Sequence, residues 1–190
     1  SLPAMSDEFL YSLEDLDSLN VSDFINLSRR GIEKENLRSN NCSISMDPHP
    51  KAYGSSLTNS RITTDFSEAL IELVTSPSGD LNSCLRELED IVYFCLKNTN
   101  EDFWPASIPM SIKDESEIPI ADYGHSNSGK LKKLYRIGLS QRYGSMMQTV
   151  SGIHYNFSFD DHLFQEWAKK EGQSLREFKD KKYLSLVRNF

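Results

Sequence analysis

The segment from residues 61 to 75 constrains the fold of this chain more than any other, because acidic residues interrupt an apolar run there. Its β-branched content and the Ser76-Pro-Ser-Gly-Asp80 turn favour a strand, although Glu68 and Glu72 would also align on one side of a helix. Read as a strand from about Ser67, the segment places Glu68, Leu70, Glu72 and Val74 on one face. Glu72 then lies midway along the apolar run, with Asp65 at its entrance. A carboxylate in that setting is costly unless it is paired or binds a cation; the alternative is a solvated outer face.

A second predicted strand, residues 29–38, also carries acids. Alternation places Glu33 and Glu35 on the same face of this strand. Two acids at this spacing repel one another unless a cation lies between them. The alternative interpretation is a solvated, charged edge strand.

The clearest alternation in the chain spans residues 151–159 and predicts a third strand. His154 and Asn156 occupy its polar face, where a single histidine is more often structural than a ligand. The opposite face is predicted to build core, and its residues are Ile153, Tyr155, Phe157 and Phe159.

Helical periodicity and capping residues predict helices in five further regions. These are residues 7–26, with one or two short helices, and residues 80–97, 130–143, 160–172 and 174–190. Asp80 is the predicted cap of the second region, and Ser174 and Glu177 form a predicted capping box at the start of the last. Cys84 and Cys95 fall on the apolar stripe of the second region and are interpreted as core residues. The third region is basic and could either meet a polyanion or form a solvated face that balances the acids.

Composition narrows the class of protein. The chain has 190 residues, enough for one domain with a core or for a core plus an appended element, and no apolar run long enough to span a bilayer. A net charge of −7 argues against a non-specific nucleic-acid binder. Three cysteines without CxxC spacing, and no signal peptide, lead us to expect a reduced, cytoplasmic protein. We expect an N-terminal helical segment over residues 1–28 and a catalytic part over residues 29–190.

The polar faces of the three strands suggest shared chemistry. If the strands are neighbours in one antiparallel sheet, one face gathers Glu33, Glu35, Asp65, Glu72 and His154. Clustered carboxylates need divalent cations, and hard oxygen ligands select Mg²⁺ or Mn²⁺ over zinc. Several such ions against a sheet suit phosphoryl transfer from ATP.

Several motifs in order make the chain resemble glutamate–cysteine ligase of the gamma-proteobacterial type. The resemblance lies in residues 30–38, 62–75, 123–130, 134–136, 142–144, 147–158 and 187–190. It implies an α+β fold similar to glutamine synthetase, in which a curved antiparallel sheet is flanked by helices, here incomplete. It also implies an enzyme that uses ATP and Mg²⁺ to join the γ-carboxyl of L-glutamate to the amino group of L-cysteine through an acyl phosphate.

The resemblance also implies roles for particular residues. Glu33, Glu35, Asp65, Glu72 and His154 should serve the metal ions and substrate pockets. Phe66 and Tyr135 should border the cysteine site, and Gln148 and Asn156 the glutamate site. No residue of this chain is assigned a direct catalytic step.

Two substitutions and the length depart from the family pattern. Ile137 replaces a usual acid, and Asn59 stands where histidine is common. Because family members are much longer, we expect this chain to be an N-terminal part, inactive alone and prone to self-association through a sheet face that the missing C-terminal part would cover. The alternatives are a related ligase with another amine acceptor and a non-catalytic module that binds Mg²⁺ or glutamate.

Overall fold

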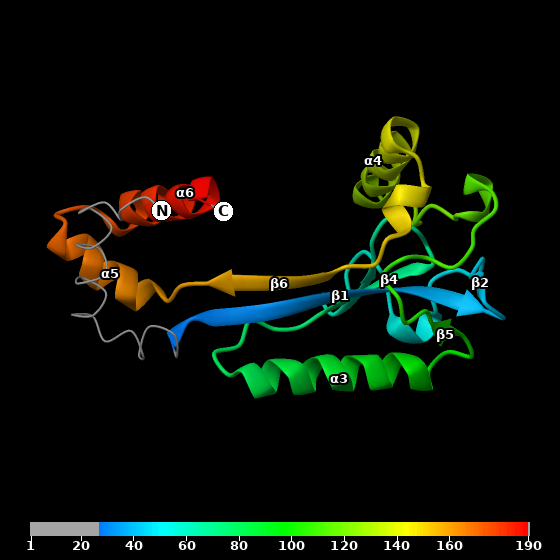
Figure 1. Cartoon of the computed structure of the whole chain (residues 1–190), viewed down its shortest axis with the longest axis horizontal. Helices are drawn as coiled ribbons and strands as arrows, with labels where there is room; N and C mark the ends of the chain where they lie inside the picture. The colour runs from blue at the N-terminus through cyan, green and yellow to red at the C-terminus, as the bar shows by residue number, and fades with distance from the viewer. Residues whose placement is uncertain (1–26, 190) are drawn as a thin grey trace, which may run out of the picture. The chain divides into compact units, whose positions relative to one another are not determined.

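The computed structural model of the chain describes residues 27–189 (Figure 1). The described residues form two compact units, one made of residues 31–156 and the other of residues 27–30 and 157–189. The one or two short helices predicted within residues 7–26 lie outside the described residues.

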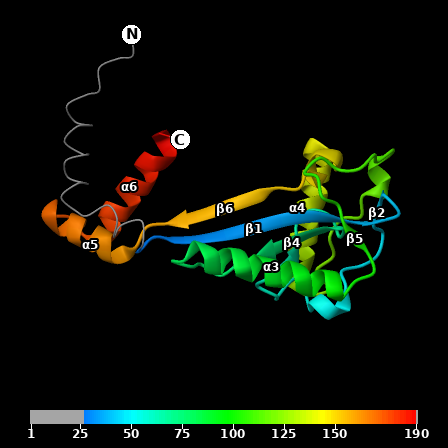
Figure 2. The same cartoon turned by 60° about the horizontal axis from the view of Figure 1, so that its bottom comes forward.

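The larger unit is built on an antiparallel sheet, as the alternating segments predict. Its strands are β1 (Arg29–Asn40), β2 (Ser43–Ile44), β3 (Ile62–Thr64), β4 (Leu70–Val74), β5 (Asp102–Phe103) and β6 (Ile153–Ser158). The order β2-β1-β4-β3 forms the main path, and β5 and β6 also pair with β1. Figures 1 and 2 show β1 as the long central strand along which the others are arranged.

Helix α3 (Leu81–Lys97) covers one face of this sheet. Asp80 caps its first turn by accepting the Ser83 N–H, as the sequence predicts. The helix packs on β3 and β4 through a cluster around Ile71 and Leu73, in which Cys95 is fully buried. The buried part of the predicted apolar stripe is shorter than the sequence indicates, because Leu81 and Leu85 at the N-terminal end of α3 are exposed.

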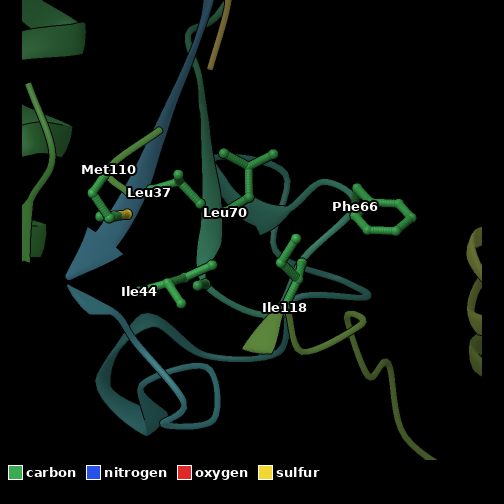
Figure 3. Packing of buried hydrophobic residues seen from close by; sticks show 7 residues of the cluster. Leu37, Ile44, Phe66, Leu70, Met110 and Ile118 are labelled. Atoms are coloured by element: carbon green, nitrogen blue, oxygen red, sulfur yellow. The ribbon is translucent and has the colours of Figure 1, made fainter. Parts of the chain in front are cut away.

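Helix α4 (Asn127–Tyr143) belongs to the opposite side of the sheet. A second core cluster there joins β1, β4 and the 104–120 segment, and Leu139 of α4 packs against it. Figure 3 shows the buried side chains of this cluster and labels Leu37, Ile44, Phe66, Leu70, Met110 and Ile118; the seventh member is Ala69. Two short 3-10 turns, η2 (Glu115–Glu117) and η3 (Met146–Thr149), flank α4 in sequence, and a third, η1 (Lys51–Tyr53), follows β2.

The smaller unit is a helical hairpin of α5 (Asp161–Lys170) and α6 (Leu175–Asn189). Ser174 and Glu177 form the predicted capping box at the start of α6, in which each side chain accepts the other residue's N–H. Phe164 and Phe178 form the buried centre of the hairpin, and Phe159 packs against them.

The predicted core face of β6 is wrong. The strand itself is present, but Ile153, Tyr155 and Phe157 are 41–71% exposed, and of the four predicted core residues only Phe159 packs in a cluster. All six residues of β6 are exposed, so within the described part of the chain no second layer covers either face of this strand. Alternation identified two faces but could not say which of them another layer covers.

Candidate functional site

The pairing of β1 with β4 brings the predicted acids together on one sheet face. Glu35 lies directly opposite Glu72 in the antiparallel register, and Glu33 lies opposite Val74. Side chains of such opposite residues leave the sheet on the same face, about 5 Å apart at their Cβ atoms. We call the face that carries Glu33, Glu35, Asp65, Glu72 and His154 the acidic face.

Strand β6 contributes the polar partners of two of these acids. Glu35 accepts the Gly152 N–H through Oε2 at 2.7 Å, while its Oε1 lies 3.2 Å from His154 Nε2. Glu33 accepts a hydrogen bond from the Asn156 side-chain amide at 2.7 Å. The polar face of β6 therefore meets the acids of β1, as the hypothesis of one shared face requires.

Gly152 leaves little room between Glu35 and His154. The Gly152 carbonyl also accepts the Glu35 N–H at 3.0 Å, so the two residues are bonded in both directions. A Cβ atom at this position would lie 2.9 Å from His154 Nε2 and 3.4 Å from Glu35 Oε2. A side chain at position 152 would therefore displace one of the two groups.

Glu72 carries the electrostatic cost of the acidic face. Burial and, after it, the carboxylates of Asp65, Glu33 and Glu35 together raise its pKa to about 7, while His154 opposes them. A half-buried carboxyl group among three other carboxylates is partly protonated near neutral pH unless it binds a cation. This is the situation that the acids of residues 61–75 indicate.

Asp65 lies at the end of β3, and its backbone is fixed on both sides. Its N–H donates to the Leu70 carbonyl at 3.0 Å, and its own carbonyl accepts from the Tyr123 hydroxyl at 3.0 Å and from Arg136 Nε. The Arg136 guanidinium also lies 4.0 Å from the Asp65 carboxylate. The carboxylate is 45% exposed, so it remains open to a ligand.

The donor atoms of the acidic face suit a hard cation, but their present arrangement is not a closed cage. Within residues 27–189, no three His, Cys, Asp or Glu side chains converge closely enough to hold one ion. Glu33 and Glu35 instead bind Asn156, Gly152 and His154. Several carboxylate oxygens on one face are the type of ligand that Mg²⁺ and Mn²⁺ prefer. The hydrogen bonds to Asn156, Gly152 and His154 hold the β1 carboxylates near one another.

The remaining predicted site residues occupy different environments. Phe66 is 1% exposed in the core cluster of Figure 3, whereas Tyr135 is exposed on α4. Tyr135 lines a hollow of about 310 Å³ with Leu139 and Arg142, and Leu139 packs against the cluster that contains Phe66. Gln148 is half-buried in η3.

Sequence patterns missed two residues that shape this region. Glu68, expected on the face of Glu72, precedes β4 in a turn, where its carboxylate accepts the N–H groups of His49 and Asp122. Glu68 is therefore a buried residue that links the loop of His49 to the loop of Asp122. Tyr123 gave no signal apart from its place in a matching motif, because its role depends on a contact 58 residues away.

The basic helix uses several of its charges within the chain. Lys133 pairs with Asp122 at 2.6 Å, and Arg136 binds at Asp65. This favours the interpretation of α4 as a partner of the chain's own acids. Among the described residues, no helix is long and apolar enough to cross a membrane.

Known sequences match most of the chain. A glutamate–cysteine ligase of Shewanella amazonensis is 46% identical over 166 residues, which cover 85% of this chain and 32% of that protein. One of Pseudoalteromonas translucida is 44% identical over 182 residues and covers 92% and 35%, respectively. The chain thus spans about a third of the length of the curated relatives it matches.

Solved structures agree with the sequences. A glutamate–cysteine ligase of Francisella tularensis in complex with AMP superposes with a TM-score of 0.74 at 44% identity, over 78% of this chain and 30% of that one. A bifunctional glutathione synthetase of Pasteurella multocida gives a TM-score of 0.79 at 29% identity, over 95% and 23%. The family model for glutamate–cysteine ligase matches residues 13–190, and the chain belongs to this family.

Proposed function

We propose that this chain is part of an ATP-dependent ligase that joins the γ-carboxyl of L-glutamate to the amino group of L-cysteine, the first step of glutathione synthesis. The observation that carries the proposal is the acidic face, where Glu35 and Glu72 are register partners and the pKa of Glu72 is about 7. Family membership supplies the reaction, and the AMP complex of the Francisella relative supports a nucleotide substrate.

The reaction has two steps. The glutamate γ-carboxylate attacks the γ-phosphorus of ATP and ADP leaves, which gives γ-glutamyl phosphate. The cysteine nitrogen then attacks the acyl carbon, loses a proton and expels phosphate as the amide forms. In the first step a carboxylate attacks an anionic phosphoryl group, and in the second step an anionic phosphate leaves, so the site needs positive charge at the phosphates.

We infer that the acidic face holds Mg²⁺ or Mn²⁺, which when bound would neutralise phosphate oxygens. Glu33, Glu35, Asp65, Glu72 and His154 are the proposed ligands. Asn156 and Gly152 orient the β1 carboxylates by hydrogen bonds. Such supporting contacts commonly set metal affinity.

We assign the substrate pockets to residues around the acidic face. Phe66 and Tyr135 are proposed for cysteine, since the hollow beside Tyr135 adjoins the core that contains Phe66. Gln148 and Asn156 are proposed for glutamate. Comparison of ADP release with cysteine and with other amines by a full-length family member that carries these 190 residues would identify the acceptor.

The experiment that tests the proposal is a calorimetric titration of Mg²⁺ and Mn²⁺ into the 190-residue chain. We expect saturable binding that is lost in the Glu33→Gln, Glu72→Gln double variant. A Glu89→Gln, Asp90→Asn variant removes the same charge from the exposed face of α3 and should bind as the parent does. Absence of binding by the folded parent chain, or equal binding by both variants, would contradict a metal site on the acidic face.

Three further proposals concern the activity, the association and the location of this chain. Because it spans about a third of its relatives, we expect no γ-glutamylcysteine from ATP, glutamate and cysteine with this chain alone, and detectable product would refute this. The exposed apolar residues of β6 should also promote self-association, which sedimentation over a range of concentrations would reveal. We place the protein in the cytoplasm, where ATP and a reduced thiol substrate are available.

A further inference from the structure

Tyr123 links the loop before α4 to the end of β3. Its side chain is 5% exposed, and its hydroxyl lies 2.6 Å from the Thr64 carbonyl and 3.0 Å from the Asp65 carbonyl. One O–H proton serves one acceptor at a time, so the hydroxyl is shared between two consecutive carbonyls. Burial raises the pKa of Tyr123, which keeps this hydroxyl a donor at neutral pH.

Two cations of α4 hold the Tyr123 ring. The guanidinium carbon of Arg136 lies 4.6 Å from the ring centroid, and Lys132 Nζ lies 4.8 Å from it. Arg136 also donates its Nε–H to the Asp65 carbonyl that the Tyr123 hydroxyl contacts. The ring and the guanidinium therefore form one unit against the backbone of Asp65, and cation–π attraction is strongest where water is excluded.

This backbone carries a carboxylate that the acidic face needs. Thr63 of β3 lies directly opposite Glu72 of β4, and Asp65 follows Thr63 by two residues, so the Asp65 backbone determines where its carboxylate lies relative to Glu72. On one side the Asp65 N–H is held by Leu70, within the sheet. On the other side its carbonyl is held by Tyr123 and Arg136, from outside the sheet.

We propose that Tyr123 is a positioning residue, which fixes the Asp65 peptide so that the Asp65 carboxylate stays on the acidic face beside Glu72. The proposal rests on the proposed function, because it assigns Asp65 to a metal site. Tyr123 touches neither metal nor substrate in this role. It also ties that site to α4, the helix that carries Tyr135.

The test compares two conservative variants of the 190-residue chain. Tyr123→Phe removes the hydroxyl and keeps the ring under Arg136. Tyr53→Phe is the matched control, because Tyr53 is 1% exposed and its hydroxyl donates to a backbone carbonyl, that of Cys95 at 2.8 Å, in the other core cluster. Both variants lose a buried hydroxyl, so a general loss of stability affects both.

Two measurements are made on each variant. Mn²⁺ affinity is followed by water-proton relaxation, and we expect roughly tenfold weaker binding in Tyr123→Phe with little change in Tyr53→Phe. The side-chain rotamer of Asp65 is followed by three-bond NMR couplings without metal. We expect one rotamer in the parent and in Tyr53→Phe, and averaged couplings in Tyr123→Phe.

The outcomes separate the proposals. Unchanged Asp65 couplings in Tyr123→Phe overturn the positioning role, whether or not metal binds. Absence of Mn²⁺ binding by the parent overturns the metal site, while the couplings still decide the role of Tyr123. If Tyr123→Phe does not fold, Arg136→Lys serves instead, since it keeps the charge but removes the Nε bond to Asp65.

Discussion

Replacement of Glu72 by glutamine should stabilise the metal-free chain at neutral and alkaline pH. The change of the Glu72 pKa from its ordinary value of 4.5 to about 7 corresponds to about 3 kcal/mol. Because the folded state holds this proton more tightly, the favourable contribution is complete below about pH 4.5 and is lost as pH rises through about 7. Glutamine is uncharged at every pH, and partial exposure reduces the expected gain at about pH 8 to roughly 2 kcal/mol.

Urea unfolding followed by tryptophan fluorescence measures this gain. The chain has two tryptophans, and a Trp167→Phe background leaves Trp104, which packs on the core cluster beside β4, as the reporter of the larger unit. Glu89→Gln on exposed α3 is the control. If Glu72→Gln gains nothing over the parent at about pH 8, or gains as much at about pH 4.5, the electrostatic reasoning is refuted.

Further predictions concern contacts elsewhere in the larger unit. Gly152→Ala should weaken Mn²⁺ binding with little loss of stability, because its Cβ would displace the half-exposed His154 ring from Glu35; unchanged calorimetry would contradict this. Burial lowers the pKa of His49 below 6.5, so stability should fall as pH drops below that value, and less so in His49→Phe, as acid titrations of thermal unfolding will show. Cys42 is exposed and should react rapidly with a thiol reagent, whereas Cys84 and Cys95, the buried cysteines of α3, should react only on unfolding.

Local signals predicted the elements of this chain well. Strands β1, β4 and β6 and helices α3 to α6 lie where alternation, helical periodicity and capping residues place them. The capping box of Ser174 and the Asp80 cap are correct in their hydrogen bonds, because such contacts join residues three apart in sequence. The acids of β1 and β4 were also recognisable, since a carboxylate in an apolar strand is unusual.

The sequence by itself therefore determined which segments are strands and helices and which side chains carry charge, because these depend on neighbours a few residues away. Only the tertiary structure decided what those side chains face. The pairing of Glu35 with Glu72 follows from the register of β1 and β4, and the bond from Tyr123 to Asp65 joins residues 58 apart. The exposure of β6 and the tie made by Glu68 likewise depend on which layers cover each strand. Periodicity assigns residues to faces, but long-range packing determines what each face meets.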